Sequence, residues 1–459
     1  MELLKAQAFG ENVSYLNGSF AEATWTYSPK KFEEMVVFTI NPSGEGFFSL
    51  LESSTVSITS KTLHYGAVNF EGAKVVVHEK EGGRWRLYLL HYDWNIARLQ
   101  KGIQTWGFPA PKLSQEEHAL ALVNLLYANG WDTNRIVTLD GNFSPAKEMY
   151  VRPFIYFGES NNITLRNRHA FGFSLIVSPQ PPYHGAGEMA LLSVPEPRSL
   201  AAPWEKRGDN YPNSMLWVRR MEDFVRWAHS QCPKIYVDGC QIVGRGYKEA
   251  LAIIKSLREI LFQNKDGAVV EGSAENVGII KGSRLLTPRI EDGCLPGFTM
   301  QKVELIAQEI GLETKREAFN LEEFKQADAP FLTGNAAGAV MPSWLVESNW
   351  EMVGPGEYLP KGPIYITTLG TAKGREVFEK IREEQQKIIQ GKSRLGKFGV
   401  YADEFLSERD VREIREMTRE MLAISQKRIA ARLVGCAPQD WKTRLADGKK
   451  ITYAQRFGI

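Results

Sequence analysis

The sequence predicts a two-domain α/β protein, and three observations lead to this prediction. Its 459 residues are enough for two domains and an appendage. Apolar strand-like runs alternate with amphipathic helical patterns along most of the chain. A polar, turn-rich stretch at residues 158–162 is typical of a connection between domains. We therefore expect an N-terminal extension with strands over 1–50, a small α/β domain over 51–160, a large domain over 165–385 and a helical C-terminal extension over 386–459.

Composition limits the class of function. An apolar content of 43%, a charged content of 24% and a net charge of +2 describe an ordinary globular protein without a polyanionic partner. Cys232 and Cys240 lack the spacing of metal ligands, so we expect no metal site. No apolar run reaches membrane-spanning length and no leader pattern opens the chain, which favours a cytoplasmic protein with no membrane contact.

Two acids stand where a strand turns, in Glu271-Gly-Ser-Ala-Glu-Asn276. Apolar, largely β-branched runs lie on both sides, so a strand–turn–strand is expected. Carboxylates enclosed in this way need partners, because burying an unpaired charge is unfavourable. Taken alone, the same segment also fits a polar hairpin with two solvated acids.

Two glycine-containing turns follow this segment. Gly293-Cys-Leu-Pro-Gly-Phe-Thr299 precedes an amphipathic helix, and Phe331-Leu-Thr-Gly-Asn-Ala-Ala337 is a strand that ends in a small turn. A helix N-terminus that follows a glycine turn presents backbone N–H groups to an anion. The sequence therefore predicts two phosphate-binding turns after a strand-end carboxylate.

The N-terminal half carries two further patterns. His64-Tyr-Gly66 and Phe70-Glu-Gly72 precede a strand that contains Lys74, and Tyr150 and Arg152 alternate in the strand Met149–Phe157. Alternate strand residues share a face, so the side chains of Tyr150 and Arg152 are expected together. Arg152 is interpreted either as a substrate contact or as half of a structural ion pair. Lys74 is interpreted either as a phosphate ligand or as an exposed strand lysine.

The turn Lys206-Arg-Gly-Asp-Asn-Tyr211 opens a helix. A lysine close to the positive end of a helix is favoured as a neutral amine, and a neutral amine is the nucleophile that carbonyl chemistry requires. An earlier helix is predicted from the capping box formed by Ser114 and Glu117.

Over roughly residues 50–385 these motifs resemble the fold-type IV pyridoxal-phosphate enzymes, the branched-chain aminotransferase family of class IV aminotransferases. The resemblance implies that Lys206 forms the Schiff base with pyridoxal 5′-phosphate and is the catalytic residue. It implies these further cofactor-binding residues: Lys74, Tyr211, Glu271, Leu295, Phe298, Thr299, Asn335 and Ala336. It places Tyr65, Tyr150, Arg152 and Ala337 on the substrate side.

The sequence also departs from the family pattern. Lys74 stands where the family has arginine, Asn335 where it more often has threonine, and Gly338 where many members carry glutamate. An insertion over about residues 217–265 is expected to reshape the substrate entrance or the subunit contact. In the C-terminal extension a helix is predicted over 407–433, and its Lys- and Arg-rich tail is interpreted as a solvated face in preference to a nucleic-acid patch.

The function implied is transfer of an amino group from a branched-chain or related hydrophobic amino acid to a 2-oxo acid such as 2-oxoglutarate, in a homodimer or higher homo-oligomer. Three alternatives stay open. The chain could be a pyridoxal-phosphate lyase, a specialised biosynthetic aminotransferase of the same fold, or a non-catalytic binding protein that keeps the fold, since fold does not imply function.

Overall fold

A computed structural model gives the protein as two compact units, and each is described by itself. Unit 1 comprises Met1–Tyr183 and Lys397–Ile459, and unit 2 comprises His184–Gly396. The structure describes residues 36–40, 46–51, 56, 58–79, 85–106, 114–129, 136–137, 143–144, 148–157, 171–179, 187–198, 202–354, 356–396, 398–405, 409–414 and 416. Within these residues, no helix is both long and apolar enough to cross a membrane.

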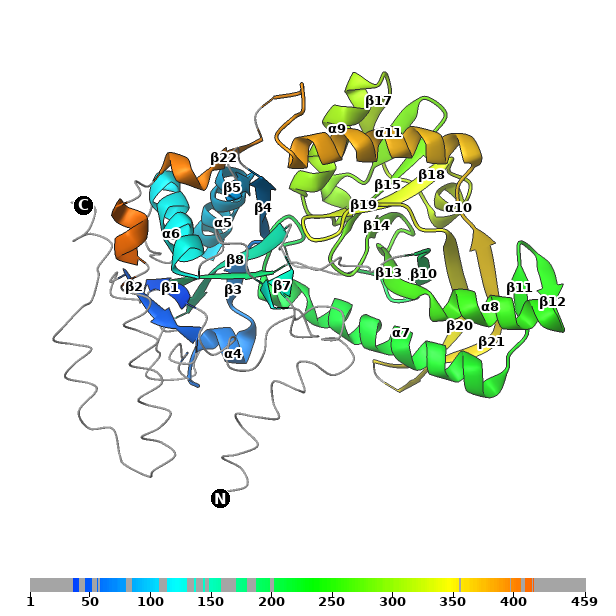
Figure 1. Cartoon of the computed structure of the whole chain (residues 1–459). Coiled ribbons are helices and arrows are strands. Elements are labelled where there is room, and N and C mark those ends of the chain that lie inside the picture. Colours follow the sequence, from blue (N-terminus) through cyan, green and yellow to red (C-terminus); the bar gives the residue numbers. More distant parts are fainter. Residues whose placement is uncertain are drawn as a thin grey trace. The chain divides into compact units, whose positions relative to one another are not determined.

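The described residues of unit 1 form an eight-stranded sheet in the order β2-β1-β9-β8-β4-β5-β22, with β3 also paired to β8 (Figure 1). Its strands are β1 (Val36–Ile40), β2 (Gly46–Leu50), β3 (Val68–Phe70), β4 (Ala73–Glu79), β5 (Trp85–Leu90), β8 (Glu148–Phe157), β9 (Phe171–Pro179) and β22 (Gly399–Tyr401). All the described pairings in this sheet are antiparallel. A separate two-stranded pair joins β6 (Ile136–Val137) to β7 (Phe143–Ser144).

The helices of unit 1 cover this sheet and complete its core. They are α4 (Lys61–Tyr65), α5 (Tyr92–Trp106) and α6 (Gln115–Ala128). α6 begins with the predicted capping box, because Ser114 accepts from Glu117 N while the Glu117 side chain accepts from Ser114 N. Buried side chains of α5 and α6, such as Ile96 and Leu122, pack against strand residues that include Val75 and Phe173.

The boundary between the units differs from the domain ranges expected from the sequence. β9 pairs with β8 and β1, so residues 171–179 belong to unit 1, although the large domain was expected to start at residue 165. β1 and β2 are likewise part of this sheet and not a separate extension. Near the other end of the chain, β22 pairs with β5. The boundary depends on strand pairing between segments far apart in the sequence, so a local sequence pattern does not predict it.

The expected C-terminal helix is described only at its start. Residues 409–414 and 416 are helical, and the remainder of the predicted range 407–433 lies outside the described residues. Ile414 is buried in the core of unit 1, and Val411 packs against that core. A short 3-10 helix, η5 (Ala402–Glu404), precedes this segment.

The part of unit 2 that the structure describes forms a twelve-stranded sheet in the order β12-β11-β21-β20-β10-β13-β14-β15-β16-β17, with β18 paired to β15 and β19 to β18. Its strands are β10 (Ala190–Ser193), β11 (Ile235–Val237), β12 (Cys240–Ile242), β13 (Leu257–Gln263), β14 (Val269–Glu271), β15 (Asn276–Lys281), β16 (Arg284–Thr287), β17 (Glu313–Arg316), β18 (Ala329–Gly334), β19 (Gly338–Val340), β20 (Trp344–Gly354) and β21 (Glu357–Thr368). Parallel and antiparallel pairs are mixed in this sheet, as the α/β prediction allows.

Helices lie on both faces of the unit 2 sheet (Figure 1). They are η3 (Gly208–Asn210), α7 (Pro212–Gln231), α8 (Arg245–Lys255), η4 (Ile290–Asp292), α9 (Phe298–Glu309), α10 (Leu321–Lys325) and α11 (Ala372–Ile389). Ile260 and Phe262 of β13 face a core that includes α7 and α8, whereas Leu261 faces a core that includes α10. Both faces are buried, which explains the continuous apolar runs in these strands.

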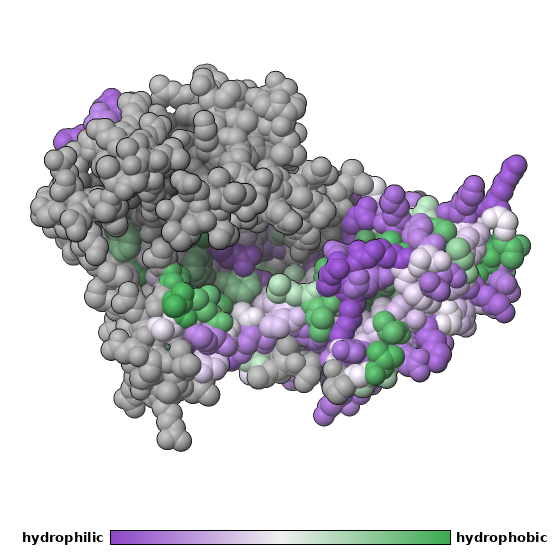
Figure 2. All heavy atoms as spheres, turned by 90° about the horizontal axis from the view of Figure 1, so that it is seen from below, coloured by the Kyte–Doolittle hydropathy of each residue, from purple (hydrophilic) through white to green (hydrophobic). Residues whose placement is uncertain are grey.

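On the face that Figure 2 presents, the coloured surface carries many hydrophilic residues. Figure 2 shows purple hydrophilic residues interspersed with smaller green patches on the face that it presents. On α7, the exposed side chains of Arg219, Glu222, Asp223 and Arg226 form ion pairs along the helix. Exposed pairs of this kind contribute little because solvent screens them, so the buried face of α7 provides most of its stabilisation.

Candidate active site

Glu271 ends β14 and is buried. β14 and β15 pair in antiparallel fashion with Glu271 opposite Asn276, which confirms the predicted strand–turn–strand. Glu271 and Glu275 are each only 3% exposed. The interpretation of this segment as a polar hairpin with solvated acids is therefore wrong.

Three donors hold the Glu271 carboxylate. Arg198 donates to Oε2, Asn276 Nδ2 donates to Oε1 at 3.0 Å, and the backbone N–H of Leu295 donates to Oε1. Burial lowers the pKa of Arg198 to about 10, which still leaves the guanidinium charged at neutral pH. Arg198 follows β10 and was missed in the sequence. The sequence indicates that Glu271 needs a cationic partner, but it does not indicate which of the 56 Lys and Arg residues is that partner.

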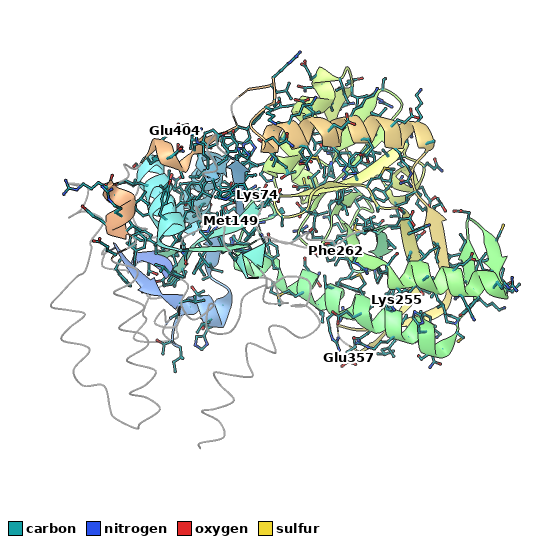
Figure 3. The ribbon with its side chains drawn as sticks, viewed as in Figure 1. Lys74, Met149, Lys255, Phe262, Glu357 and Glu404 are labelled. Atoms are coloured by element: carbon teal, nitrogen blue, oxygen red, sulfur yellow. The ribbon has the colours of Figure 1, made fainter. Side chains whose placement is uncertain are left out.

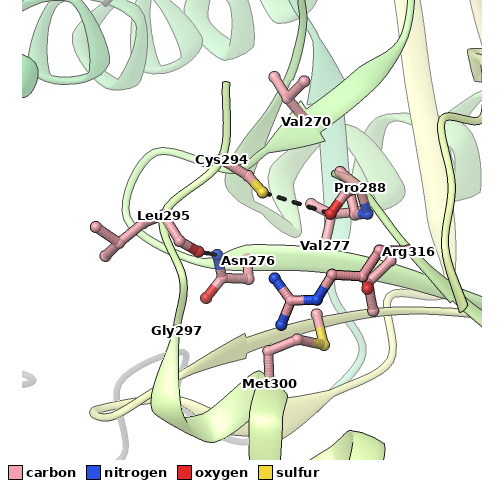
Figure 4. Close-up of a pocket in the computed structure, with 10 residues that line it drawn as sticks. Val270, Asn276, Val277, Pro288, Cys294, Leu295, Gly297, Met300 and Arg316 are labelled. Carbon is pink, nitrogen blue, oxygen red and sulfur yellow. Dashed lines mark hydrogen bonds between the residues drawn. The ribbon is translucent and has the colours of Figure 1, made fainter. Parts of the chain in front are cut away.

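The turn Gly293–Gly297 is fixed against the same Asn276. Asn276 Nδ2 also donates to the Leu295 carbonyl at 2.6 Å (Figure 4). A Cβ at Gly297 would lie 1.7 Å from Asn276 Oδ1, so only glycine fits there. Figure 4 also shows the thiol of Cys294, which donates to the Pro288 carbonyl at 3.5 Å, at a small pocket behind the turn. Asn276 thus connects the Glu271 strand end to the turn that carries Leu295.

The two predicted phosphate-binding turns lie together. Thr299, in the first turn of α9, donates from Oγ1 to Oδ1 of Asn335 at 2.8 Å. Asn335, Ala336 and Ala337 form the tight turn between β18 and β19. No side chain caps α9 at Gly297, so the positive end of this helix is directed at the turn of residues 335–337.

Lys206 and Tyr211 are also neighbours. Lys206 Nζ donates to Tyr211 Oη at 3.2 Å, and the ammonium lies 5.6 Å from the centre of the tyrosine ring. Asn210 is buried, and its Nδ2 donates to the carbonyls of Ala202 at 3.0 Å and Glu205 at 2.9 Å. Asn210 therefore fixes the backbone that leads to Lys206. Its role was missed in the sequence, although it stands within the quoted turn.

In unit 1, Lys74 is not an exposed strand lysine. Its side chain is 8% exposed, and its Nζ lies 2.5 Å from Glu148 Oε2. Lys74 on β4 is opposite Tyr150 on β8, and Figure 3 labels Lys74 together with the neighbouring Met149. A buried ammonium of this kind needs its carboxylate partner. The geometry thus gives Lys74 a structural ion pair that the sequence did not predict.

Tyr150 and Arg152 share a face of β8, as predicted. Arg152 Nη2 donates to Tyr150 Oη at 2.8 Å, and its guanidinium lies 4.5 Å from the centre of the Phe70 ring. Among the residues that the structure describes, Arg152 has no carboxylate partner. Tyr65, at the end of α4, is 43% exposed.

Part of the chain is similar to a known protein family and to curated proteins. A family model described as amino-transferase class IV matches residues 225–341, which include Glu271, Thr299 and Asn335 and begin after Lys206. The branched-chain-amino-acid aminotransferase 2, chloroplastic, of Arabidopsis thaliana is 25% identical over 70% of this chain and 75% of its own length. The probable branched-chain-amino-acid aminotransferase of Aquifex aeolicus is 26% identical over 69% of this chain and 86% of its own length.

Solved structures share the fold. The branched-chain aminotransferase of Thermoproteus uzoniensis, solved with norvaline, has a TM-score of 0.56 at 23% identity and covers 80% of this chain and 99% of its own. The branched-chain amino acid aminotransferase of Thermobaculum terrenum, in its PLP form, has a TM-score of 0.56 at 17% identity. It covers 81% of this chain and 99% of its own.

These similarities confirm the predicted fold class and the predicted resemblance. Class IV aminotransferases are enzymes that use pyridoxal 5′-phosphate. With the family match over the Glu271–Ala337 region and the same fold in solved structures, the chain is similar to the class IV, branched-chain aminotransferases.

Proposed function

We propose that this chain uses pyridoxal phosphate to transfer an amino group from a branched-chain-like or related hydrophobic amino acid to a 2-oxo acid such as 2-oxoglutarate. The observation that carries the proposal is the 3.2 Å contact between Lys206 Nζ and Tyr211 Oη. It is a primary amine beside a phenol, in the unit that also holds the Glu271 strand end and the two turns that we propose for the phosphate. The A. thaliana and A. aeolicus relatives are described as branched-chain aminotransferases, which supports this substrate class.

The described residues fit the phosphate end of this cofactor. The uncapped N-terminus of α9 offers backbone N–H groups, and the bond from Thr299 to Asn335 brings the second turn beside them. Such an arrangement of helix end and small turn is a ready-made anion site. In this proposal Phe298, Thr299, Asn335 and Ala336 hold the phosphate.

The described residues also fit the ring end. An ionised carboxylate has about four lone-pair sites. Glu271 receives three described donors, so acceptor capacity is left for a protonated pyridine nitrogen. Leu295, whose N–H is bonded to Glu271, would pack on the ring, and Tyr211 would bond its phenolic oxygen.

Bound pyridoxal phosphate supplies the electron sink for bonds at the amino-acid α-carbon. The chain supplies placement and proton transfer. Lys206 Nζ anchors the cofactor and then moves a proton to and from the α-carbon, as a general base and acid. Tyr211 holds this amine in place through its hydroxyl, and Asn210 keeps the turn in position.

Arg152 is the substrate contact that we propose in unit 1. Arg152 offers a guanidinium held by Tyr150 and Phe70, and a carboxylate can be bound bidentately by such a group. Tyr65, Tyr150 and Ala337 complete the proposed substrate set. Because Lys74 is bonded to Glu148, its contribution to phosphate binding would come from charge and not from a planar fork.

We further propose a cytoplasmic homodimer or higher homo-oligomer. Measuring sedimentation at the concentration used for activity tests the assembly: the active species should be at least a dimer, and a fully active monomer would refute it.

The proposed reaction is tested by mixing the cofactor-loaded protein with glutamate alone. Transfer of the amino group should abolish the visible absorption in a single turnover and release 2-oxoglutarate, and addition of 4-methyl-2-oxopentanoate should restore the colour. The Lys206→Ala variant is the control and should give neither change. Release of ammonia in place of colour recovery would identify a lyase, and a protein that never acquires visible absorption would contradict cofactor binding.

A further inference from the structure

Gln385 is a polar residue in the buried stripe of α11. The helix buries Phe378, Ile381, Gln385 and Ile388, at intervals of three or four residues. Helical periodicity predicts an apolar residue at each of these positions. Gln385 is nevertheless only 4% exposed. Burying an amide without a partner is unfavourable, so this glutamine is expected to bind a specific group.

The group that Gln385 binds belongs to β19. The backbone N–H of Ala339 donates to Gln385 Oε1 at 3.2 Å. In the part of the chain that the structure describes, β19 pairs with β18 alone, so its other edge has no strand neighbour. Ala339 is buried. A buried N–H at a sheet edge needs an acceptor from another element, and α11 provides that acceptor.

The turn of residues 335–337 lies directly before this bond. Gly334 and Gly338 are paired at the base of the turn, and Gly338 has a φ of 72°. Glycine is conformationally permissive, so a turn between two glycines depends on contacts with other elements to hold one conformation. The Gln385 oxygen reaches the end of this turn, since a Cβ at Gly338 would lie 3.9 Å from it.

Two helices therefore hold the turn at its two ends. On α9, the Thr299 hydroxyl donates to Asn335 at the start of the turn. On α11, Gln385 accepts from Ala339 just after it. Both helices lie against β18, the strand that leads into the turn (Figure 1). The turn is thus fixed by its neighbours and not by its own residues.

We propose that Gln385 is a positioning residue for phosphate binding, because it holds the far end of the turn that presents Asn335 and Ala336 to the anion. The inference deepens the proposed function and rests on it, since it concerns the turn that we assign to the cofactor phosphate. Gln385 acts through the backbone of Ala339 and is assigned no contact with the cofactor. An amide oxygen suits this role, because a carboxylate at the same place would repel the phosphate.

The test compares two ligands on the full-length chain. Pyridoxal 5′-phosphate carries the phosphate, and pyridoxal has a hydroxyl in its place. Gln385→Met keeps nearly the same length but has no oxygen to accept from Ala339. Titration followed by visible absorption should show roughly fivefold to tenfold weaker binding of pyridoxal 5′-phosphate than in the wild type, the effect of one lost hydrogen bond. Binding of pyridoxal should stay unchanged.

This comparison separates positioning from a general loss of structure. A purely structural role would weaken both ligands equally, and equal losses would overturn the proposal. Unchanged affinity for both ligands would overturn it as well.

Thr371→Val is the matched control on the same helix. Thr371 caps α11 at its other end, where its side chain accepts from the N–H of Gly374 at 3.0 Å. The variant should have a lower urea midpoint and wild-type affinity for both ligands. A selective loss of pyridoxal 5′-phosphate binding in Thr371→Val as large as that in Gln385→Met would trace the effect to helix stability and overturn the proposal.

A second measurement uses the wild type and does not depend on whether a variant folds. Coupling between two events is reciprocal, so if the bond from Ala339 to Gln385 favours phosphate binding, bound phosphate favours the bond. Hydrogen exchange of the Ala339 amide should therefore slow more with saturating pyridoxal 5′-phosphate than with saturating pyridoxal. Equal slowing by the two ligands would overturn the proposal.

The outcomes distinguish this inference from the proposed function. A wild type that binds neither ligand would contradict the proposed function and this inference with it. A wild type that binds pyridoxal 5′-phosphate, together with a Gln385→Met variant that shows no selective loss, would contradict the role of Gln385 alone.

Discussion

Thr299 and Asn335 stand 36 residues apart in the sequence, yet their side chains are joined by a hydrogen bond of 2.8 Å. The bond connects the first turn of α9 to the turn between β18 and β19. Two segments that separately fit an anion are thus held as one group of donors. In our proposal, the phosphate of the cofactor binds to this group of donors in unit 2.

Changing Thr299→Val should weaken cofactor binding. Valine has nearly the same shape but lacks the hydroxyl, so the bond that joins the first turn of α9 to Asn335 is lost. One neutral hydrogen bond contributes about 1 kcal/mol, which predicts roughly a fivefold to tenfold loss of affinity. Equilibrium titration with pyridoxal phosphate measures this affinity in the variant and in the wild type.

Thr314→Val provides the control, because Thr314 bonds Gln308 on the surface of the same unit. Its affinity for the cofactor should equal that of the wild type. Equal affinity in Thr299→Val as well would show that the phosphate binds elsewhere.

Changing Glu271→Gln should reduce the rate far more than cofactor affinity. The carboxylate keeps a pyridine nitrogen protonated, and glutamine cannot supply the negative charge. We expect kcat to fall by about a hundredfold or more, in line with the contribution of a positioned ionisable group. Arg198 also loses its charged partner, so the free energy of unfolding should fall by about 3 kcal/mol.

Glu304→Gln is a matched variant in the same unit, since Glu304 also pairs with an arginine, Arg316. It should retain wild-type activity. Unchanged activity in Glu271→Gln would assign the ring nitrogen to another acid or to none.

The elements around the site could be predicted from local sequence. The apolar runs on both sides of Glu271 predicted β14 and β15, and the glycine turn before Phe298 predicted the start of α9. Each signal is local, since it depends on strand periodicity or on residues at a helix end. The alternation in β8 likewise predicted that Tyr150 and Arg152 lie together.

The partners of these residues could not be predicted in the same way. Arg198 lies 73 positions from Glu271, and Lys74 lies 74 positions from Glu148. The choice of partner depends on which strands become neighbours, and that is decided by burial over the whole unit. For the same reason β9 and β22 could not be assigned to the sheet of unit 1 from their own residues.

Asn210→Ala should impair catalysis without changing the fold of unit 2. The variant loses two bonds to the carbonyls of Ala202 and Glu205, so the turn before Lys206 becomes mobile. We expect kcat to fall about tenfold to a hundredfold, because small misplacement of a catalytic group has effects of this size. Asn320→Ala, which removes the cap of α10, should lower stability but leave kcat unchanged. A fall in stability alone for Asn210→Ala would make its role purely structural.

Arg152→Met should discriminate between amino donors. If Arg152 binds the second carboxylate of glutamate, the variant loses a hydrogen bond to a charged group, which contributes about 1.5–3 kcal/mol. The binding of glutamate should then weaken roughly tenfold to a hundredfold. An apolar donor such as leucine should change far less, so the ratio of the two kcat/KM values is the measurement. Equal losses for both donors would make Arg152 structural, and no loss for either would place the carboxylate elsewhere.

The position of the cofactor on the chain tests the central claim most directly. Borohydride reduction of the pyridoxal-phosphate-loaded protein, followed by peptide mapping, should place the label on Lys206 and nowhere else. Lys248 and Lys255 are the informative alternatives, because both lie on α8, are exposed and stand in the segment interpreted as an insertion. Figure 3 labels Lys255. A label on Lys206 would support the account, and a label on Lys248 or Lys255 would contradict it.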